Sequence, residues 1–194
     1  MIALRHALFL AVLLSGCALT SRSEPVAWQY FTPEDGKPVL HNAEVPSELQ
    51  ALCLERVSAG AAFGRRIAHS DGGYRVTYYP DRRWTDEPDR YVRRALERTL
   101  FEEGGFRCNV GANAARLDVE VLKFEELTTK ETHAARVSLH VVVTTDQVVS
   151  DETIDAVEPV RGSTFDDVVA AIGRALDRAS HDIASRARST LAKP

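Results

Sequence analysis

The sequence has few cysteine, tryptophan and methionine residues and no long apolar run. Among its 194 residues there are 3 cysteines, 2 tryptophans and 1 methionine. The longest unbroken apolar run covers residues 7–14, far short of the ~20 residues that a membrane-spanning helix needs. The 24 basic residues are outnumbered by 28 acidic ones, which gives a formal net charge of −4. This balance argues against nucleic acid as a partner and against a general patch for anionic membranes.

The first 16 residues have the pattern of a bacterial lipoprotein signal peptide. Arg5 supplies a positive charge, the apolar run of residues 7–14 follows, and small residues lead to Cys17. The letters L-S-G-C resemble a lipobox, in which the cysteine is acylated and becomes the first residue of the mature chain. Several acyl chains hold a protein stably on a membrane, whereas one does not. We therefore expect lipidation of Cys17. Because Ala18 is not an aspartate, the sequence resembles lipoproteins that are sent to the outer membrane and face the periplasm.

Composition divides the chain into three segments. Residues 1–16 are the expected signal peptide. Residues 17–46 are rich in proline and serine without any regular period, which predicts a lipidated flexible tether. Residues 47–194 are long enough to form a single α+β domain with its own core.

Two cysteines follow Cys17, at positions 53 and 108. In an oxidising compartment Cys53 and Cys108 could form a disulfide, which would stabilise the domain by about 2–4 kcal/mol. The alternative is a pair of buried free thiols, because sequence does not give the distance between the two Cα atoms.

Alternation of apolar and polar residues predicts several strands. They cover residues 49–57, 65–70, 74–79, 106–110, 116–124, 135–143 and 147–157. The turn D-G-G at residues 71–73 joins a hairpin, which we expect to stop at Pro80. A change of phase at Leu122 and Phe124 predicts a bulge or a twist in the strand that contains them.

Two segments have the period of an amphipathic helix. The first follows Thr85 or Asp86 as the expected N-cap and ends at Gly104-Gly105. The second covers about residues 164–191, and the letters S-T-F-D at residues 163–166 resemble a capping box. Together the elements predict an α+β fold, with a mostly antiparallel mixed sheet and two main helices packed on one face.

The sequence carries no recognisable catalytic or metal-binding pattern. Nucleophile-elbow, P-loop, dinucleotide-binding and zinc-protease motifs are absent, and the 6 histidines are scattered without ligand spacing. Acidic neighbours such as Glu125-Glu126, and the pair Asp118 and Glu120, are expected to be solvated. We therefore predict that the protein is not an enzyme, binds no metal and has no cofactor besides the covalent lipid on Cys17.

The segment Y-Y-P-D-R-R-W at residues 78–84 concentrates aromatic and basic side chains before the first helix. Tyr79, Arg83 and Trp84 have two interpretations. They form either a structural corner, with an arginine stacked on an aromatic ring, or a surface that docks a partner, because Trp, Tyr and Arg are favoured at binding hot spots.

Several of these features together resemble a known family. Residues 65–106 contain a strand of the form Y-x-V-x-Y-Y, a corner of the form R-W-x-x-x-P at residues 83–88, and a helix that begins a few residues later. Residues 117–126, residues 134–143 and the final helix fit the second half of the same pattern. The chain resembles the ABC-type transport auxiliary lipoprotein family, which includes the PqiC-like lipoproteins of Mce-type lipid transport systems.

This resemblance implies an outer-membrane-anchored periplasmic lipoprotein that serves as a non-catalytic adaptor in lipid transport. The implied partners are an Mce-domain protein and an ABC permease complex, besides the membrane that holds the lipid on Cys17. Family analogy also implies a homo-oligomer. Two other functions stay open at this point: a periplasmic module that itself binds lipid, and an envelope hydrolase or assembly factor unrelated to transport.

Overall fold

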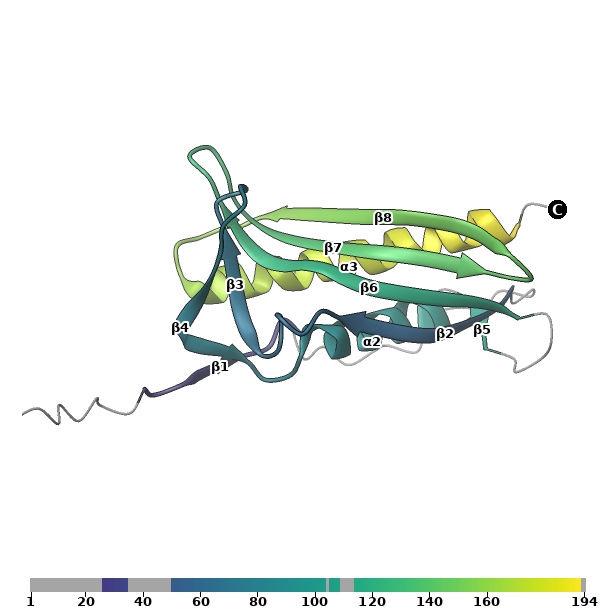
Figure 1. Ribbon diagram of the computed structural model, residues 1–194, viewed down its shortest axis with the longest axis horizontal. Helices are drawn as coiled ribbons and strands as arrows, with labels where there is room; N and C mark the ends of the chain where they lie inside the picture. The colour runs from purple at the N-terminus through teal and green to yellow at the C-terminus, as the bar shows by residue number, and fades with distance from the viewer. Residues whose placement is uncertain (1–25, 35–49, 104, 109–113, 193–194) are drawn as a thin grey trace, which may run out of the picture.

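The computed structural model describes residues 26–34, 50–103, 105–108 and 114–192 (Figure 1). Its strands are β1 (Gln29–Phe31), β2 (Gln50–Ala59), β3 (Arg66–Ser70), β4 (Val76–Trp84), β5 (Phe106–Arg107), β6 (Ala115–Thr128), β7 (His133–Thr144) and β8 (Val148–Pro159). Its helices are α2 (Pro88–Glu97), the π-helical extension η2 (Arg98–Glu103) and α3 (Phe165–Leu191). The strands form one mixed sheet, and α2 and α3 lie on one face of it (Figure 1), which confirms the predicted α+β class.

The long strand β6 organises the sheet. Along one side it pairs with β7 in antiparallel fashion over its whole length, and β7 pairs with β8 in the same way. Its other side is shared, because the first half of β6 pairs in parallel with β2 and the last part pairs in parallel with β3. From β3 the sheet continues through β4 to β1, and from β2 it continues to β5. The sheet therefore forks beside β6, and the branch of β3 and β4 is steeply rotated relative to β6–β8 (Figure 1).

The predicted bulge in β6 is confirmed. The register between β6 and β7 shifts between Val121 and Lys123. As a result Leu122 is exposed, while Phe124 returns to the buried face. The bulge bends β6 at the point where its neighbour changes from β2 to β3.

The prediction that Pro80 ends the hairpin is wrong, because β4 continues to Trp84. Arg66 of β3 lies opposite Arg83, whereas Ala68 lies opposite Tyr78, so β4 carries an irregularity between these pairs. Pro80 lies inside it, where a missing N–H breaks no ladder hydrogen bond. The last three residues of β4 then pair with β1.

The N-cap of helix α2 (Pro88–Glu97) lies two residues after the first expected cap, Thr85. This N-cap is Glu87, whose side chain makes no capping hydrogen bond, and Pro88 occupies the first turn. Proline fits there because the first N–H groups of a helix have no intrahelical partner. The prediction of Thr85 or Asp86 as the cap is therefore wrong, although the Asp86 side chain accepts a hydrogen bond from the backbone N–H of Glu87 at 3.0 Å.

Helix α3 begins with a capping box, one residue later than the sequence suggested. Thr164 is the N-cap, and Asp167 closes the box with reciprocal side-chain and backbone hydrogen bonds. The predicted box at residues 163–166 is thus wrong by one position. The hydrogen bonds from Thr164 hold the pKa of the Asp167 carboxyl below its usual range, which favours a negative charge at the positive end of the helix.

The hydrophobic core fills the space between the sheet and the two helices. The apolar stripes predicted for the helices are buried; for α2 and η2 they are Val92, Ala95, Leu96, Thr99 and Leu100, and for α3 they include Val168, Ile172, Ala175, Leu176, Ala179, Ile183 and Ala187. Small residues along α3 let it lie close to β7 and β8 (Figure 1).

Residues 26–34 are part of the folded domain. Strand β1 pairs in parallel with the end of β4, and the carbonyl oxygen of Phe31 accepts a hydrogen bond from the backbone N–H of Thr85 at 2.9 Å. Pro33 is buried. The prediction of a flexible tether over all of residues 17–46 is therefore wrong for this stretch. The expected signal peptide and Cys17 lie outside the described residues.

A disulfide joins Cys53 of β2 to Cys108, which follows β5 directly. The two Cα atoms are 4.5 Å apart, and 55 positions separate the residues in the sequence. The pairing of β2 with β5 places them side by side. The disulfide links strand β2 to the segment that follows η2.

Candidate functional site

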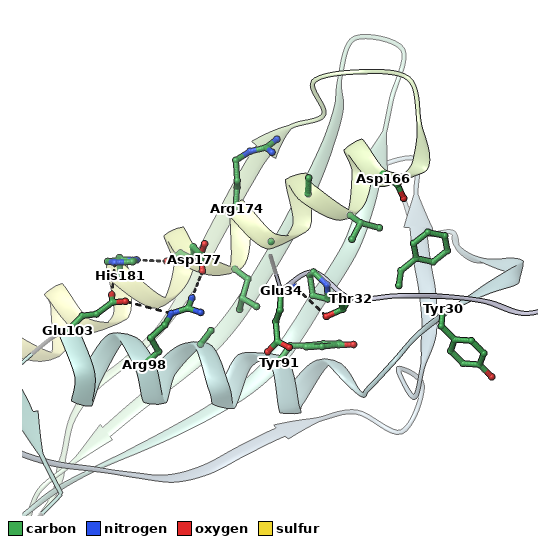
Figure 2. A pocket seen from close by; sticks show the side chains of 17 residues that line it. Tyr30, Thr32, Glu34, Tyr91, Arg98, Glu103, Asp166, Arg174, Asp177 and His181 are labelled. Carbon is green, nitrogen blue, oxygen red and sulfur yellow. Dashed lines mark hydrogen bonds and ion pairs between the residues drawn. The ribbon is translucent and has the colours of Figure 1, made fainter. Parts of the chain in front are cut away.

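An open groove of about 980 Å³ lies between the two helices and the chain that leads into the domain (Figure 2). One wall is formed by α2 and η2, the other by α3, and residues 30–34 cross one end. Its apolar lining comes from Phe31, Pro33, Tyr91, Ala95, Val169, Ala170, Gly173 and Leu176. Its charged lining comes from Glu34, Arg98, Glu103, Asp166, Arg174, Asp177 and His181. The groove therefore combines an apolar lining with charged side chains from both helices.

Ion pairs bridge the helices at one end of this groove (Figure 2). The Arg98 guanidinium lies 2.6 Å from the Asp177 carboxylate and 3.7 Å from that of Glu103. The His181 ring is held on both sides, since Nδ1 is 2.8 Å from the carbonyl oxygen of Asp177 and Nε2 is 3.4 Å from Glu103. With both ring nitrogens engaged, His181 is poorly placed to act as a general base on a substrate.

A second cluster of charged side chains holds the lead-in segment, residues 31–34, across the opposite end of the groove. Arg94 of α2 donates to Glu34 at 2.6 Å and to Asp86 at 3.0 Å. The hydrogen bond with Glu34 is the main cause that raises the pKa of Arg94. Desolvation raises the pKa of Asp86, but the hydrogen bonds from Arg94 and from the backbone of Glu87 outweigh it and hold that pKa below its usual value. Both shifts favour the charged forms of Arg94 and Asp86, and the hydrogen bond to Glu34 fixes residues 31–34 against α2.

The three residues of the expected corner separate into different environments. Trp84 is fully buried, and its ring packs edge-to-face on Tyr91 and Phe124, with centroids 6.1 and 5.6 Å away. Tyr79 is half-buried and packs edge-to-face on Phe165 at 4.9 Å. A fully buried Trp84 contributes to the core and is not available to a partner. For this residue the structural interpretation is therefore the one that the geometry supports.

Arg83 alone of the three points to the outer face of the sheet. Its guanidinium lies 3.8 Å from the centroid of the Trp28 ring and donates to the carbonyl oxygens of Tyr79 and Arg82 at 2.9 and 2.7 Å. The stacked ring is thus Trp28, in the segment that was expected to be a tether, and not Trp84. Sequence reasoning missed Trp28 because nothing local indicates that it pairs with β4.

Two acidic residues expected to be solvated are buried. Glu125 is 2% exposed and accepts hydrogen bonds from Ser70, at 3.1 Å, and from Arg136. Glu126 is 6% exposed and contacts the Tyr79 hydroxyl and the His133 ring. Burial, together with the hydrogen bond to Glu126, raises the pKa of Tyr79 well above its usual value. These networks join β3, β4, β6 and β7 and serve structure, since every member already has a partner.

The described residues meet neither the requirements of a metal site nor those of a membrane-spanning helix. In that part of the chain no group of three His, Cys, Asp or Glu side chains is arranged to hold a metal ion. None of its helices is both long enough and apolar enough to cross a membrane. The groove itself was not foreseen from the sequence, because its walls come from three segments that are far apart along the chain.

Comparison with known proteins gives a family and a fold. A family model described as "ABC-type transport auxiliary lipoprotein component" matches residues 38–184. The fold is similar to the crystal structure of a Xanthomonas campestris protein, with a TM-score of 0.64 and 18% identity over 83% of this chain and 92% of that one. It is also similar to the crystal structure of an uncharacterized protein, with a TM-score of 0.61 and 14% identity over 83% and 99% of the two chains. The comparison with curated proteins gave no match.

Proposed function

The chain belongs to the ABC-type transport auxiliary lipoprotein family, and we propose that it is a non-catalytic adaptor of an Mce-type lipid transport system, anchored in the outer membrane and facing the periplasm. As a member of this family it is an envelope-associated lipoprotein that works in a complex with transporter components. The outer membrane, the Mce-domain partner and the absence of catalysis are our additions to that statement.

The lipobox supports the anchor. The apolar run of residues 7–14 ends in small residues and Cys17, and Ala18 follows in place of an aspartate. Acylation of Cys17 would hold the domain on the periplasmic face of the outer membrane by several acyl chains. No other covalent or bound cofactor is needed for an adaptor.

The groove between α2 and α3 is the single observation that best supports an adaptor role. It is open, its apolar lining includes Ala95, Ala170 and Leu176, and both helices contribute charged side chains to it. An elongated segment of a partner protein, apolar on one face and polar on its flanks, matches this distribution. An acyl chain fits it less well, because it would place hydrocarbon against the ion-paired, polar side chains of Glu103 and Asp177.

The test is recovery of partners with the tagged, full-length chain from envelope extracts after chemical cross-linking. We expect an Mce-domain protein and an ABC permease to copurify. Ala170→Arg places a charged side chain in the groove and should reduce recovery at least tenfold. Ser185→Arg adds the same charge at an exposed position of α3 outside the groove, so it should not.

Recovery of neither transporter component with the wild-type chain would overturn the adaptor function. Equal recovery with Ala170→Arg would show instead that the partner binds elsewhere. Cys17→Ser provides the test of the anchor: we expect the wild-type protein to incorporate labelled palmitate and to sediment with outer membranes, and the variant to do neither.

A further inference from the structure

Five side chains form an aromatic and basic surface on the face of the sheet opposite the helices. We call it the aromatic–arginine face; its members are Trp28, Tyr30, Arg66, Tyr78 and Arg83. Tyr30 is in register with Arg83, which is in register with Arg66, so the three share one face. Figure 2 shows the Tyr30 side chain pointing away from α3, at the end of the groove that Tyr30 borders. Trp28 and Tyr78 join the same surface because Arg83 and Arg66 stack on their rings, at 3.8 and 4.0 Å.

Two of the three aromatic members of this surface are open to solvent, and the third, Tyr78, is partly buried. Trp28 is 44% exposed and Tyr30 is 58% exposed, and Val26, just before them, is 53% exposed. Residues 26, 28 and 30 alternate along the chain, as expected for side chains on one face of an extended segment. Such a concentration of large exposed side chains on an outermost strand marks an interaction surface.

The two arginines of the face carry charges that no carboxylate neutralises within the described residues. Arg66 donates to the carbonyl oxygen of Ala62, and Arg83 donates to two backbone carbonyl oxygens. Most arginines on the helical side differ, because they pair with Asp or Glu, as Arg98 does with Asp177. Two guanidinium groups that are each stacked on a ring and lack an acidic partner are suited to bind an anionic group such as a phosphate.

The position of this face along the chain indicates which partner it meets. Only 11 positions separate Trp28 from Cys17, and an extended chain advances at most about 3.6 Å per residue, or about 40 Å in total. Under the proposed function Cys17 carries the lipid anchor, on which this inference rests. The face therefore lies within about 40 Å of Cys17, whatever path the intervening chain takes.

We propose that the aromatic–arginine face lies on the membrane that holds the lipid anchor. Trp28 and Tyr30 lie at the level of the lipid headgroups, as amphipathic aromatic residues do at membrane interfaces. Arg83 and Arg66 bind lipid phosphates. The net charge of −4 gives the whole chain no attraction to anionic lipid, so the attraction is local to this face. In this orientation α2, α3 and the groove face away from the membrane, toward a periplasmic partner.

The tryptophans allow a direct test, because the chain has 2 of them and they differ in environment. Trp84 is fully buried and serves as an internal reference. The lipidated full chain would be reconstituted into vesicles of phosphatidylethanolamine and phosphatidylglycerol whose acyl chains are brominated near the carbonyl end. We expect roughly twofold quenching of tryptophan emission, since bromine quenches rings at the headgroup level. Trp28→Phe, which leaves Trp84 alone, should abolish the quenching.

Charge variants separate the two parts of the face. Replacing Arg66 and Arg83 together by glutamine should reduce quenching of Trp28, and replacing phosphatidylglycerol by a zwitterionic lipid should reduce it in the wild type. Arg178→Gln on α3, which removes an arginine that pairs with Glu158 at 3.3 Å, is the matched control and should have no effect.

Three outcomes would overturn the inference. Unquenched Trp28 in a chain whose Cys17 is shown by mass spectrometry to be acylated would refute the membrane contact and leave the anchor intact. A chain without acyl groups on Cys17 would refute the anchor and the inference together. A blue shift of Trp28 emission that depends on protein concentration, without quenching by brominated lipid, would show that the face binds a second copy of this chain.

Discussion

The carbonyl oxygen of Pro33 leaves no room for a Cβ atom at Gly173, because a Cβ built there would lie 2.4 Å from that oxygen. Glycine inside a helix costs about 1 kcal/mol relative to alanine, and Gly173 lies in the middle of α3. The close approach explains why this position lacks a side chain. It lets residues 31–34 cross the groove in direct contact with α3.

Gly173→Ala should therefore release the lead-in segment while strengthening the helix. We expect faster amide hydrogen exchange over residues 29–34 than in the wild type, with unchanged or slower exchange in α3. Hydrogen exchange followed by mass spectrometry measures both. Ser185→Ala, an exposed position of the same helix, is the control and should leave residues 29–34 unaffected. Unchanged protection of the segment in Gly173→Ala would mean that the contact with Pro33 does not hold it.

The buried Glu125 forms an ion pair with Arg136. The carboxylate is 2% exposed, and Arg136 lies opposite it in the β6–β7 ladder. Removing one partner of a buried ion pair typically costs 3–5 kcal/mol, whereas replacing both can be close to neutral. We expect Arg136→Met to lower the free energy of unfolding in urea by about 3 kcal/mol. The double variant with Glu125→Leu should recover most of that loss. If the free energy of unfolding of Arg136→Met lay within about 0.5 kcal/mol of that of the wild type, this role of Arg136 would be contradicted.

Glu125 also shows where sequence reasoning stops. The alternation of β6 and β7, the bulge near Leu122 and the buried stripe of α3 follow from local patterns of apolar residues, and they are present in the structure. Two adjacent glutamates have the local pattern of a solvated surface. Their burial is decided by Ser70, Tyr79 and Arg136, which the topology brings from other strands.

Local sequence patterns also failed to predict where β4 ends and which residues form the exposed surface around Arg83. β4 passes Pro80 because β1, from residues that read as a tether, pairs with its last residues. Of the expected corner, Arg83 alone belongs to an exposed surface, and its partner Trp28 lies far away in the sequence. Long-range pairing determines these features, and a single sequence contains no local signal for it.

The disulfide between Cys53 and Cys108 closes a loop with a sequence separation of 55. A cross-link of this kind restricts the unfolded chain and stabilises a domain typically by 2–4 kcal/mol. Replacing both cysteines by serine should lower the unfolding free energy by about that amount. Adding a reductant should destabilise the wild type similarly and leave the double variant unchanged. A wild type whose urea transition does not respond to the reductant would contradict this prediction.

Alkaline pH should weaken the contact between Tyr79 and Glu126. Burial, followed by the hydrogen bond to Glu126, raises the pKa of the Tyr79 hydroxyl, whereas in the unfolded chain it ionises near its ordinary value of about 10. A raised pKa in the folded state means that the stabilisation is complete below pH ~10 and is lost progressively as the pH rises above it.

Tyr79→Phe isolates this contribution, because the other tyrosines and the lysines titrate in both proteins. Near pH 8 the variant should be less stable by about 1–2 kcal/mol, since Glu126 loses a hydrogen-bond donor while remaining buried. Between about pH 9 and 11 the unfolding free energy of the wild type should fall more steeply, so that the two curves converge. Urea titrations at a series of pH values measure both curves. Curves that stay parallel over this range would show that the Tyr79 proton is not held by the fold, and that Glu126 is stabilised by His133 alone.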